Sequence, residues 1–271
     1  DAPDAALPSL SERSGEDGIY VLFTSGTTGM PKGALNTHEA IANLLAAMTP
    51  VIGERSKTVL CSTNMTFDIF ITESLLALAL GKCVVLADEE EMLIPHRLAE
   101  LIERENVDTA QLTPSRLQMC MGSDAFRKAS ARLGAMILVG EPLTLHLAGL
   151  WREATKAKLY NMYGPTEAAV YVSGIESSGE TERVTIGRPL QNCRVYALDS
   201  KLRRVMPTAR GELYLAGVCL AKGYIGRPDI TAAAFVEDPF FPVKKMYKSG
   251  DIGRLLPDGT FEFLGRRDSQ I

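Results

Sequence analysis

A loop rich in glycine and hydroxyl side chains follows an apolar run near the start of the chain. The run, residues 19–24, has the composition of a β-strand, and the loop after it leads to a lysine. Glycines let backbone N–H groups approach an anion, hydroxyls add donors and the lysine adds positive charge, which is the chemistry of a phosphate site. The residues that this interpretation assigns to phosphate binding are Thr24, Ser25, Gly26, Thr27, Thr28, Gly29 and Lys32.

This loop is not a Walker motif, because Pro31 lies five residues after Gly26, where that motif has a glycine followed by a lysine. An ordinary glycine-rich turn after a strand is the alternative interpretation.

A second polar cluster, residues 161–167 (NMYGPTE), lies at the end of a predicted strand. Open parallel sheets bind ligands at the carboxyl ends of their strands. Tyr163 offers a ring for stacking, Thr166 a hydroxyl, and Glu167 a hard carboxylate oxygen that suits Mg²⁺. A Gly-Pro turn that leads into a helix beginning at Thr166 and Glu167 is the alternative.

A third group of charged residues lies toward the end of the chain. Asp251 follows Gly250 in YKSGD (residues 247–251), and its carboxylate can accept hydrogen bonds from both hydroxyls of a ribose. A solvated loop is the alternative for Asp251, as it is for Arg266 and Asp268.

Several classes of protein lack support in the sequence. The three histidines, His38, His96 and His146, lack metal-ligand spacing, and neither G-x-S-x-G nor a dinucleotide-binding G-x-G-x-x-G is present. The five cysteines contain no C-x-x-C pair, which argues against a disulfide framework or a zinc site and favours a reducing cytoplasm. A net charge of -4 and the lack of a long apolar stretch predict a soluble chain that binds neither nucleic acid nor membrane.

From residue 18 to residue 173, runs rich in β-branched residues alternate with stretches of helical period. Strands are predicted near residues 19–24, 57–62, 83–87, 108–112, 135–139 and 157–161. Helices are predicted near residues 37–48, 69–80, 95–105, 114–121 and 143–154. The alternation predicts an α/β fold with a doubly wound, flavodoxin-like parallel sheet.

The alternation of strand-like and helical segments ends at a polar stretch, residues 174–183 (GIESSGETER), which predicts a domain boundary near 175–185. Shorter strand-like runs follow at residues 193–199, 211–216 and 260–264, separated by glycine and proline turn signals. We therefore expect an α/β unit over residues 1–180 and a small β-rich barrel or sheet over residues 181–271.

Taken in order, six segments of the chain resemble the core motifs of the acyl- and aminoacyl-adenylate-forming superfamily. These segments are residues 20–33, 67–68 (FD), 161–167, 211–213 (GEL), 247–251 and 265–270. YGPTE at 163–167 and GYIGRPDITAAAF at 223–235 make the chain most similar to nonribosomal peptide synthetase adenylation domains. The resemblance runs from about residue 18 to the end of the chain.

The resemblance implies that ATP and an amino acid react to give aminoacyl-AMP and pyrophosphate. The aminoacyl group would then pass to the phosphopantetheine thiol of a carrier protein, in a parent protein that also has a condensation domain. An acyl-CoA or aryl-acid ligase is the alternative within this superfamily.

The resemblance also implies a role for each motif. Lys32 and the loop before it would hold the β- and γ-phosphates, Tyr163 would stack on adenine, Thr166 would contact the α-phosphate, and Glu167 would hold Mg²⁺. Lys32, Thr166 and Glu167 are the residues expected to be catalytic. The whole set expected around ATP and Mg²⁺ is Thr24, Ser25, Gly26, Thr27, Thr28, Gly29, Lys32, Asn161, Tyr163, Gly164, Thr166, Glu167, Asp251 and Arg266. Asp251 would bind the ribose hydroxyls, with Arg266 beside it, and Asp268 would lie at a hinge.

On the amino-acid side, the resemblance implies that Asp68 pairs with the substrate ammonium group, since a desolvated charge needs a partner. An aspartate at a helix N-terminus is a second interpretation, compatible with the first. The expected lining of the side-chain pocket is Ile69, Thr72, Gln111, Ile137, Val139, Gly140, Met162, Val170 and Tyr171. This mostly apolar set predicts an uncharged, apolar amino acid of small to medium size, although Gln111 allows a polar group.

The family's N-terminal part of the core and its C-terminal lid, which carries a lysine, have no counterpart in the motifs found. We therefore expect exposed apolar surface on the larger unit. We also expect the isolated chain to be a catalytically silent nucleotide-binding fragment.

Overall fold

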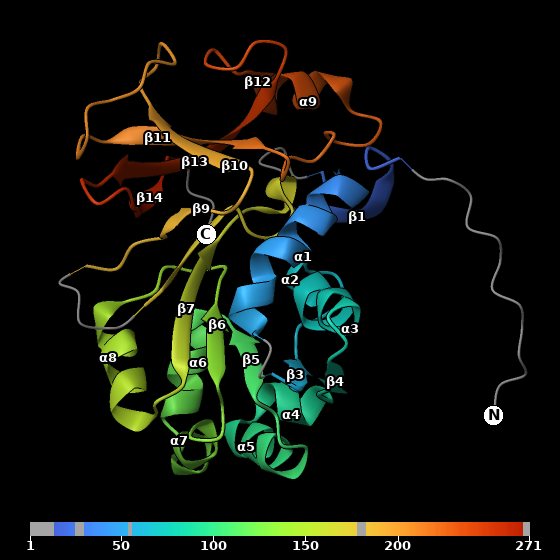
Figure 1. Cartoon of the computed structure of the whole chain (residues 1–271), viewed down its shortest axis with the longest axis vertical. Helices are drawn as coiled ribbons and strands as arrows, with labels where there is room; N and C mark the ends of the chain where they lie inside the picture. Colours follow the sequence, from blue (N-terminus) through green and yellow to red (C-terminus); the bar gives the residue numbers. More distant parts are fainter. Residues whose placement is uncertain (1–13, 25–29, 54–55, 178–182, 268–271) are drawn as a thin grey trace, which may run out of the picture.

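The computed structural model describes residues 14–24, 30–53, 56–177 and 183–267. A larger α/β unit and a smaller β-rich unit stack along the long axis of the molecule (Figure 1). The larger unit is built on a seven-stranded sheet with the order β4-β3-β5-β6-β7-β8-β9. Its strands are β3 (Thr58–Cys61), β4 (Cys83–Leu86), β5 (Thr109–Leu112), β6 (Ala135–Leu138), β7 (Lys158–Tyr163), β8 (Ser173–Glu176) and β9 (Arg188–Pro189). Strands β3 to β7 are parallel, which confirms the predicted parallel sheet, and β8 and β9 extend it in the antiparallel direction.

Helices cover both faces of this sheet. The helices are α1 (His38–Ile52), α2 (Ile69–Ile71), α3 (Ala77–Ala79), α4 (Glu89–Leu93), α5 (Pro95–Arg104), α6 (Pro114–Met121), α7 (Asp124–Ser130) and α8 (Leu145–Ala154). Helices α5 to α8 pack in one apolar cluster, while α1 and the segment from α2 to α3 pack in another with the opposite face. This two-sided cover confirms the doubly wound arrangement.

Local signals explain where the predicted helices begin. Thr37, Thr113 and Thr144 each accept a hydrogen bond from a backbone N–H in the first turn of the helix that follows. The predicted helix at 69–80 is one continuous segment, but a π-helical turn (Thr72–Leu76) separates α2 from α3. The short helices α4 and α7 were not predicted.

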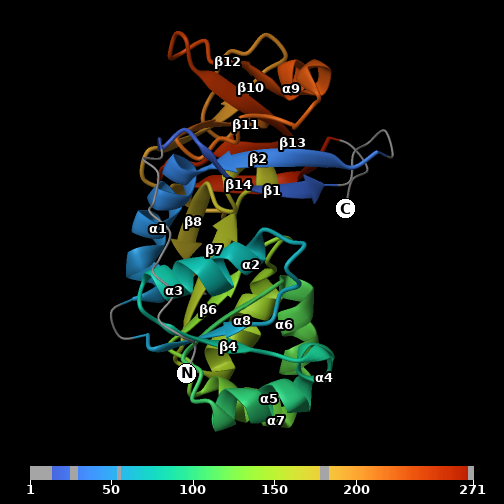
Figure 2. The same cartoon turned by 90° about the vertical axis from the view of Figure 1, so that its right-hand side faces the viewer.

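The predicted place of the first strand in the parallel sheet is wrong. β1 (Gly18–Thr24) pairs antiparallel with β2 (Lys32–Thr37), and the two form a separate hairpin. β2, which was not predicted, follows β1 after a connection too short for the crossover that a parallel pair needs, so the two strands pair antiparallel with each other. The hairpin lies between the two units, beside β13 and β14 of the smaller one (Figure 2).

The smaller unit is a curled antiparallel sheet with the order β10-β11-β13-β12, in which β14 also pairs with β13. Its elements are β10 (Cys193–Leu198), β11 (Gly211–Gly217), α9 (Pro228–Ala234), β12 (Phe235–Glu237), β13 (Lys245–Leu255) and β14 (Phe261–Arg266). This confirms the expected β-rich unit, although β12 and β13 were not predicted. Strand β9, which follows the expected boundary at residue 180, still pairs with the larger sheet.

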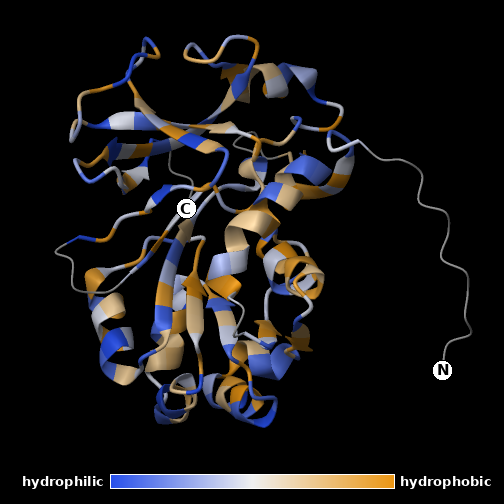
Figure 3. Ribbon diagram, viewed as in Figure 1, coloured by the Kyte–Doolittle hydropathy of each residue, from blue (hydrophilic) through white to orange (hydrophobic). Residues whose placement is uncertain are grey.

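Exposed apolar side chains lie on β4, at the far edge of the larger sheet, and on the helical segment that precedes it. Leu75, Leu78 and Leu86 have 49%, 58% and 69% of their surface exposed, and Figure 3 shows hydrophobic ribbon in this region. All five cysteines are free thiols, in agreement with the predicted lack of disulfides. In the described part of the chain, no helix combines the length and the apolar character that a membrane span requires.

Candidate nucleotide and substrate site

The two ends of the β1–β2 hairpin hold Thr24 and Lys32 opposite each other. The two residues are partners in the register of the hairpin, on either side of the predicted phosphate loop. Ser25, Gly26, Thr27, Thr28 and Gly29 lie outside the described residues. The Thr24 hydroxyl is buried and has no hydrogen-bond partner among the described residues, so it fits a phosphate oxygen. At the two ends of the predicted loop, the described residues thus offer one buried hydroxyl and one ammonium group.

Glu167 lies beside Lys32, at the junction between the two units. Its side chain is on a single 3₁₀ turn (Thr166–Ala168) after β7 and is 4% exposed. Glu167 Oε1 is 3.8 Å from Lys32 Nζ and accepts a 2.6 Å hydrogen bond from the Tyr224 hydroxyl. A short 3₁₀ helix does begin at Thr166, as the alternative interpretation predicts, but it ends after three residues and no side chain caps it. Tyr224 lies in the segment 223–235 noted from the sequence, but no role was predicted for it.

The chemistry of Glu167 suits Mg²⁺, since a buried carboxylate supplies hard oxygen atoms. Among the described residues, no group of three or more histidine, cysteine, aspartate or glutamate side chains is placed to share a metal ion. Mg²⁺ commonly binds one or two carboxylates and takes its other ligands from water and substrate phosphates, and Glu167 would supply one such carboxylate.

Asp251 lies in the middle of β13, where it is 5% exposed. The interpretation of Asp251 and Arg266 as solvated loop residues is therefore wrong, while Asp268 lies outside the described residues. Arg266, the register partner of Asp251 on β14, donates a 2.8 Å hydrogen bond from Nη1 to Asp251 Oδ1. The Tyr163 hydroxyl donates to Asp251 Oδ2. These contacts bring together a ring, a carboxylate and a guanidinium from motifs far apart in the sequence.

Burial and then the Asp251 charge hold the pKa of Tyr163 well above its ordinary value, so this phenol stays a hydrogen-bond donor. A second ring, that of Phe263 on β14, has its centroid 6.4 Å from that of Tyr163 at an interplanar angle of 41°. Phe263 was not predicted as a site residue. The two rings offer apolar surface for a planar base beside Asp251.

Two other residues of the expected ATP set have structural contacts. A side chain at Gly164 would lie 2.5 Å from the Val170 carbonyl oxygen, so this turn requires glycine. The Asn161 side-chain amide donates a 2.7 Å hydrogen bond to the Thr185 carbonyl, which attaches the segment between β8 and β9 to β7.

Burial raises the pKa of Asp68, the nearby Thr166 side chain opposes this, and the negative charge of Glu167 adds to it. Thr166 and Glu167 therefore lie near Asp68 in the fold. Asp68 does lie at the N-terminus of α2, but its side chain caps no backbone group there. The FD motif and the YGPTE motif thus meet in space, and the carboxylate environment favours a cationic ligand.

Thr72, Gln111 and Tyr171 form a buried polar cluster beneath Asp68. Thr72 Oγ1 lies 3.2 Å from both Gln111 Oε1 and Tyr171 Oη, and the Tyr171 hydroxyl donates to Gln111. The other apolar residues expected in the pocket, each at most 4% exposed, pack in one cluster with Tyr171: Ile137, Val139, Met162 and Val170. Gly140 lies beside Ile69, because a side-chain carbon at Gly140 would be 3.9 Å from Ile69 Cδ1.

A cavity of about 260 Å³ adjoins this cluster. Of the expected set only Ile69 and Gln111 line it, together with side chains such as Phe67, Thr113 and Arg116 that were not predicted. The expected residues are therefore neighbours, but most of them are packed against one another.

The family model described as "AMP-binding enzyme" matches residues 2–225. The chain therefore belongs to that family, and the fold and these contacts agree with this assignment. Enterobactin synthase component F of Escherichia coli (strain K12) is 38% identical over 264 residues, which cover 93% of this chain and 20% of that protein. Phosphinothricin tripeptide synthetase PhsB of Streptomyces viridochromogenes is 37% identical over 283 residues, which cover 100% of this chain and 24% of that protein.

Among solved structures, the nonribosomal peptide synthetase FmoA3 in its AMPPNP-bound form has a TM-score of 0.85 and 30% identity, covering 93% of this chain and 28% of that one. The fold is therefore that of nonribosomal peptide synthetase adenylation domains. The chain spans less than a third of the length of each of these relatives.

Proposed function

We propose that this chain carries the nucleotide and side-chain sites of an enzyme that activates an amino acid as its aminoacyl-AMP, with release of pyrophosphate. The observation that supports this most is the proximity of Asp68 to Thr166, whose side chain acts on the pKa of the Asp68 carboxyl. The carboxylate that we propose for the substrate ammonium is thus near the hydroxyl that we propose for the α-phosphate. An amino acid held by Asp68 would present its own carboxylate to that phosphate.

The ATP side of the proposal rests on groups around the junction of the two units. Lys32, the Thr24 hydroxyl and the loop between them would neutralise the β- and γ-phosphates. Asp251 would accept hydrogen bonds from the ribose hydroxyls, and Tyr163 and Phe263 would contact the base. When bound at Glu167, Mg²⁺ would offset the negative charge that builds up as pyrophosphate leaves. No covalent nucleophile is needed, because positioning and charge neutralisation account for this type of reaction.

The state of Asp68 supports an ammonium substrate. Burial and the charge of Glu167 raise its pKa, and a bound ammonium group would lower it again by pairing with the charged form. We propose that the side chain of the substrate is uncharged and mostly apolar, because Ile137, Val139 and Met162 pack with Tyr171 in the apolar cluster beside the pocket region. Gln111 and Thr72 give that region one polar side.

We further propose that the aminoacyl group is passed to the phosphopantetheine of a carrier protein, in a gene product that also has a condensation domain. The relatives named as enterobactin synthase and phosphinothricin tripeptide synthetase support this. For the chain by itself we propose nucleotide binding without adenylate formation.

The test is acid-dependent exchange of labelled pyrophosphate into ATP by the complete gene product. The panel pairs each amino acid with the matched acid that lacks the amino group. We expect exchange with one or a few apolar amino acids and none with the matched acids that lack the amino group. Asp68→Asn should lower the exchange at least about 10-fold, because the substrate ammonium loses a charged partner. Equal or better exchange with the acids that lack an amino group would identify an acyl or aryl ligase instead.

A further inference from the structure

Tyr224 lies between the two oppositely charged side chains that the proposed function assigns to phosphate and Mg²⁺. Its hydroxyl donates a 2.6 Å hydrogen bond to Glu167 Oε1 and accepts a 3.1 Å hydrogen bond from Lys32 Nζ. Lys32 Nζ and Glu167 Oε1 are 3.8 Å apart, which is longer than a hydrogen-bonded ion pair. The phenol oxygen therefore bridges a long ion pair whose two charges are not hydrogen-bonded to each other.

The two charged partners make this bridge directional, because a carboxylate accepts hydrogen bonds and an ammonium group donates them. A phenol has one proton to donate and lone pairs to accept with. Because Glu167 takes the proton, the lone pairs remain for the Lys32 ammonium group.

Backbone contacts fix Tyr224 to the strand that carries Lys32. The Leu35 N–H donates a 3.0 Å hydrogen bond to the Gly223 carbonyl, and the Ile225 N–H donates a 2.9 Å bond to the Gly33 carbonyl. The Tyr224 N–H donates to Thr231 Oγ1 at 2.9 Å. The tyrosine is therefore held on both sides along β2.

The Tyr224 ring is held as firmly as its backbone. It is 5% exposed and packs edge-on against Phe235, with 5.8 Å between the ring centroids. The Lys32 ammonium lies over the ring, 4.7 Å from its centroid, where the ring electrons attract a cation.

We propose that Tyr224 is a positioning residue that keeps the long ion pair of Lys32 and Glu167 from closing into a hydrogen-bonded one. This inference rests on the proposed function, because it assigns the lysine to phosphate and the carboxylate to Mg²⁺. A direct pair would neutralise both groups, so nucleotide and metal would have to separate them before binding. With the phenol in place, each charge is oriented and remains available.

The test uses Tyr224→Phe in the complete gene product, since this change removes one oxygen and keeps the ring under Lys32. We expect the KM for ATP and the Mg²⁺ concentration for half-maximal pyrophosphate exchange to rise about 10-fold, the effect of losing a hydrogen bond to a charged group. The KM for the amino acid should change less than about 2-fold, because that site is unaltered. Thermal unfolding of each variant checks that it folds.

Tyr196→Phe is the matched control. The Tyr196 hydroxyl also lies between charged groups, accepting a 2.9 Å bond from Arg194 and donating a 3.2 Å bond to Asp238, but it belongs to the other face of the small sheet. We expect its Mg²⁺ dependence to equal that of the wild type. A Mg²⁺ shift of the same size in this control would overturn the specific role of Tyr224.

A double-mutant cycle with Glu167→Gln separates positioning from a general loss of structure. If Tyr224 acts through Glu167, adding Tyr224→Phe to Glu167→Gln should change the Mg²⁺ dependence less than about 2-fold. The inference is overturned if Tyr224→Phe shifts the Mg²⁺ dependence about 10-fold even when Glu167→Gln is present. It is also overturned if Tyr224→Phe alone leaves the Mg²⁺ dependence unchanged. In both cases, adenylation by the wild type would still support the proposed function. If the wild type shows neither exchange nor Mg²⁺-dependent nucleotide binding, the proposed function fails and the inference fails with it.

Discussion

Glu73, a buried carboxylate beside the pocket region, makes stability depend on pH in a direction that can be worked out. The side chain is 1% exposed, and Oε2 accepts 2.9 Å hydrogen bonds from the backbone N–H groups of Ser62 and Thr63. The Thr63 hydroxyl donates to Oε1 at 2.7 Å. Burial raises the pKa of Glu73 from its ordinary value of 4.5 to about 7, although these hydrogen bonds oppose the change.

The folded protein therefore binds this proton more tightly than the unfolded chain does. Below pH 4.5 both states are protonated, and the stability that the proton contributes is fully present. As the pH rises from 4.5 through 7, the unfolded chain releases the proton first, so stability is lost over that window. For a single group, the two pKa values correspond to a decrease in the free energy of unfolding of about 2.5 kcal/mol between about pH 5 and pH 8.

Urea unfolding at about pH 5, 6, 7 and 8 measures this loss in the wild type and in Glu73→Gln. The amide does not titrate, so the free energy of unfolding of the wild type should fall relative to that of Glu73→Gln by about 2.5 kcal/mol over this range. Glu103→Gln, at an exposed position on α5, is the control for losing one carboxylate and should follow the wild type. Parallel pH profiles for wild type and Glu73→Gln would refute this account of the buried charge.

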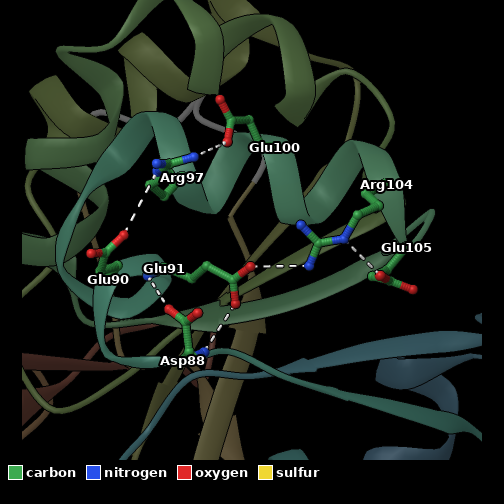
Figure 4. A network of polar contacts seen from close by, with 7 residues as sticks. All are labelled: Asp88, Glu90, Glu91, Arg97, Glu100, Arg104 and Glu105. Carbon is green, nitrogen blue, oxygen red and sulfur yellow. Dashed lines mark hydrogen bonds and ion pairs between the residues drawn. The ribbon is translucent and has the colours of Figure 1, made fainter.

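Two further predictions concern stability. Gly187→Ala should lower the free energy of unfolding in urea by about 3 kcal/mol or more, because φ at Gly187 is +76° and the new side-chain carbon would lie 2.0 Å from the Gly174 carbonyl oxygen. A decrease below about 1 kcal/mol would contradict this account of the turn. Arg104→Ala removes the arginine that bridges Glu91 and Glu105 in the surface network of Figure 4. This change should lower the free energy of unfolding by less than about 1 kcal/mol in the same assay, because the arginine is largely solvated. A decrease above about 2 kcal/mol would show that the network stabilises the fold.

The parallel sheet was predictable because its strands are short apolar runs, separated by helices with clear starting signals. Pro95 and Pro114 lie in the first turn of α5 and α6, where a missing N–H does least harm. β13 was not predictable in the same way. Its sequence, KMYKSGDIGRL, has two glycines and several charges, and its strand conformation depends on pairing with β11, β12 and β14.

The charged and hydroxyl groups of the site were predictable because their types imply a chemistry. Lys32, Glu167 and Asp251 stand in motifs with glycine or proline neighbours, and each is found at the junction of the two units. Tyr224 and Phe263 were not found from the sequence, since an aromatic residue in a β-rich segment most often belongs to the core. Only the fold shows that one of them contacts two charges and that the other faces Tyr163.

The central claim is that a nucleotide binds at the junction of the two units, with its ribose at Asp251. The most direct measurement is calorimetric titration of this chain with AMPPNP and Mg²⁺, comparing the wild type with Asp251→Asn. We expect the wild type to bind and Asp251→Asn to bind about 10-fold more weakly, because one charged acceptor of the ribose hydroxyls is lost. Asp229→Asn, an exposed aspartate paired with Arg227 on the surface, should bind as the wild type does. Equal affinity in the Asp251 and Asp229 variants, or no binding by the wild type, would contradict the claim.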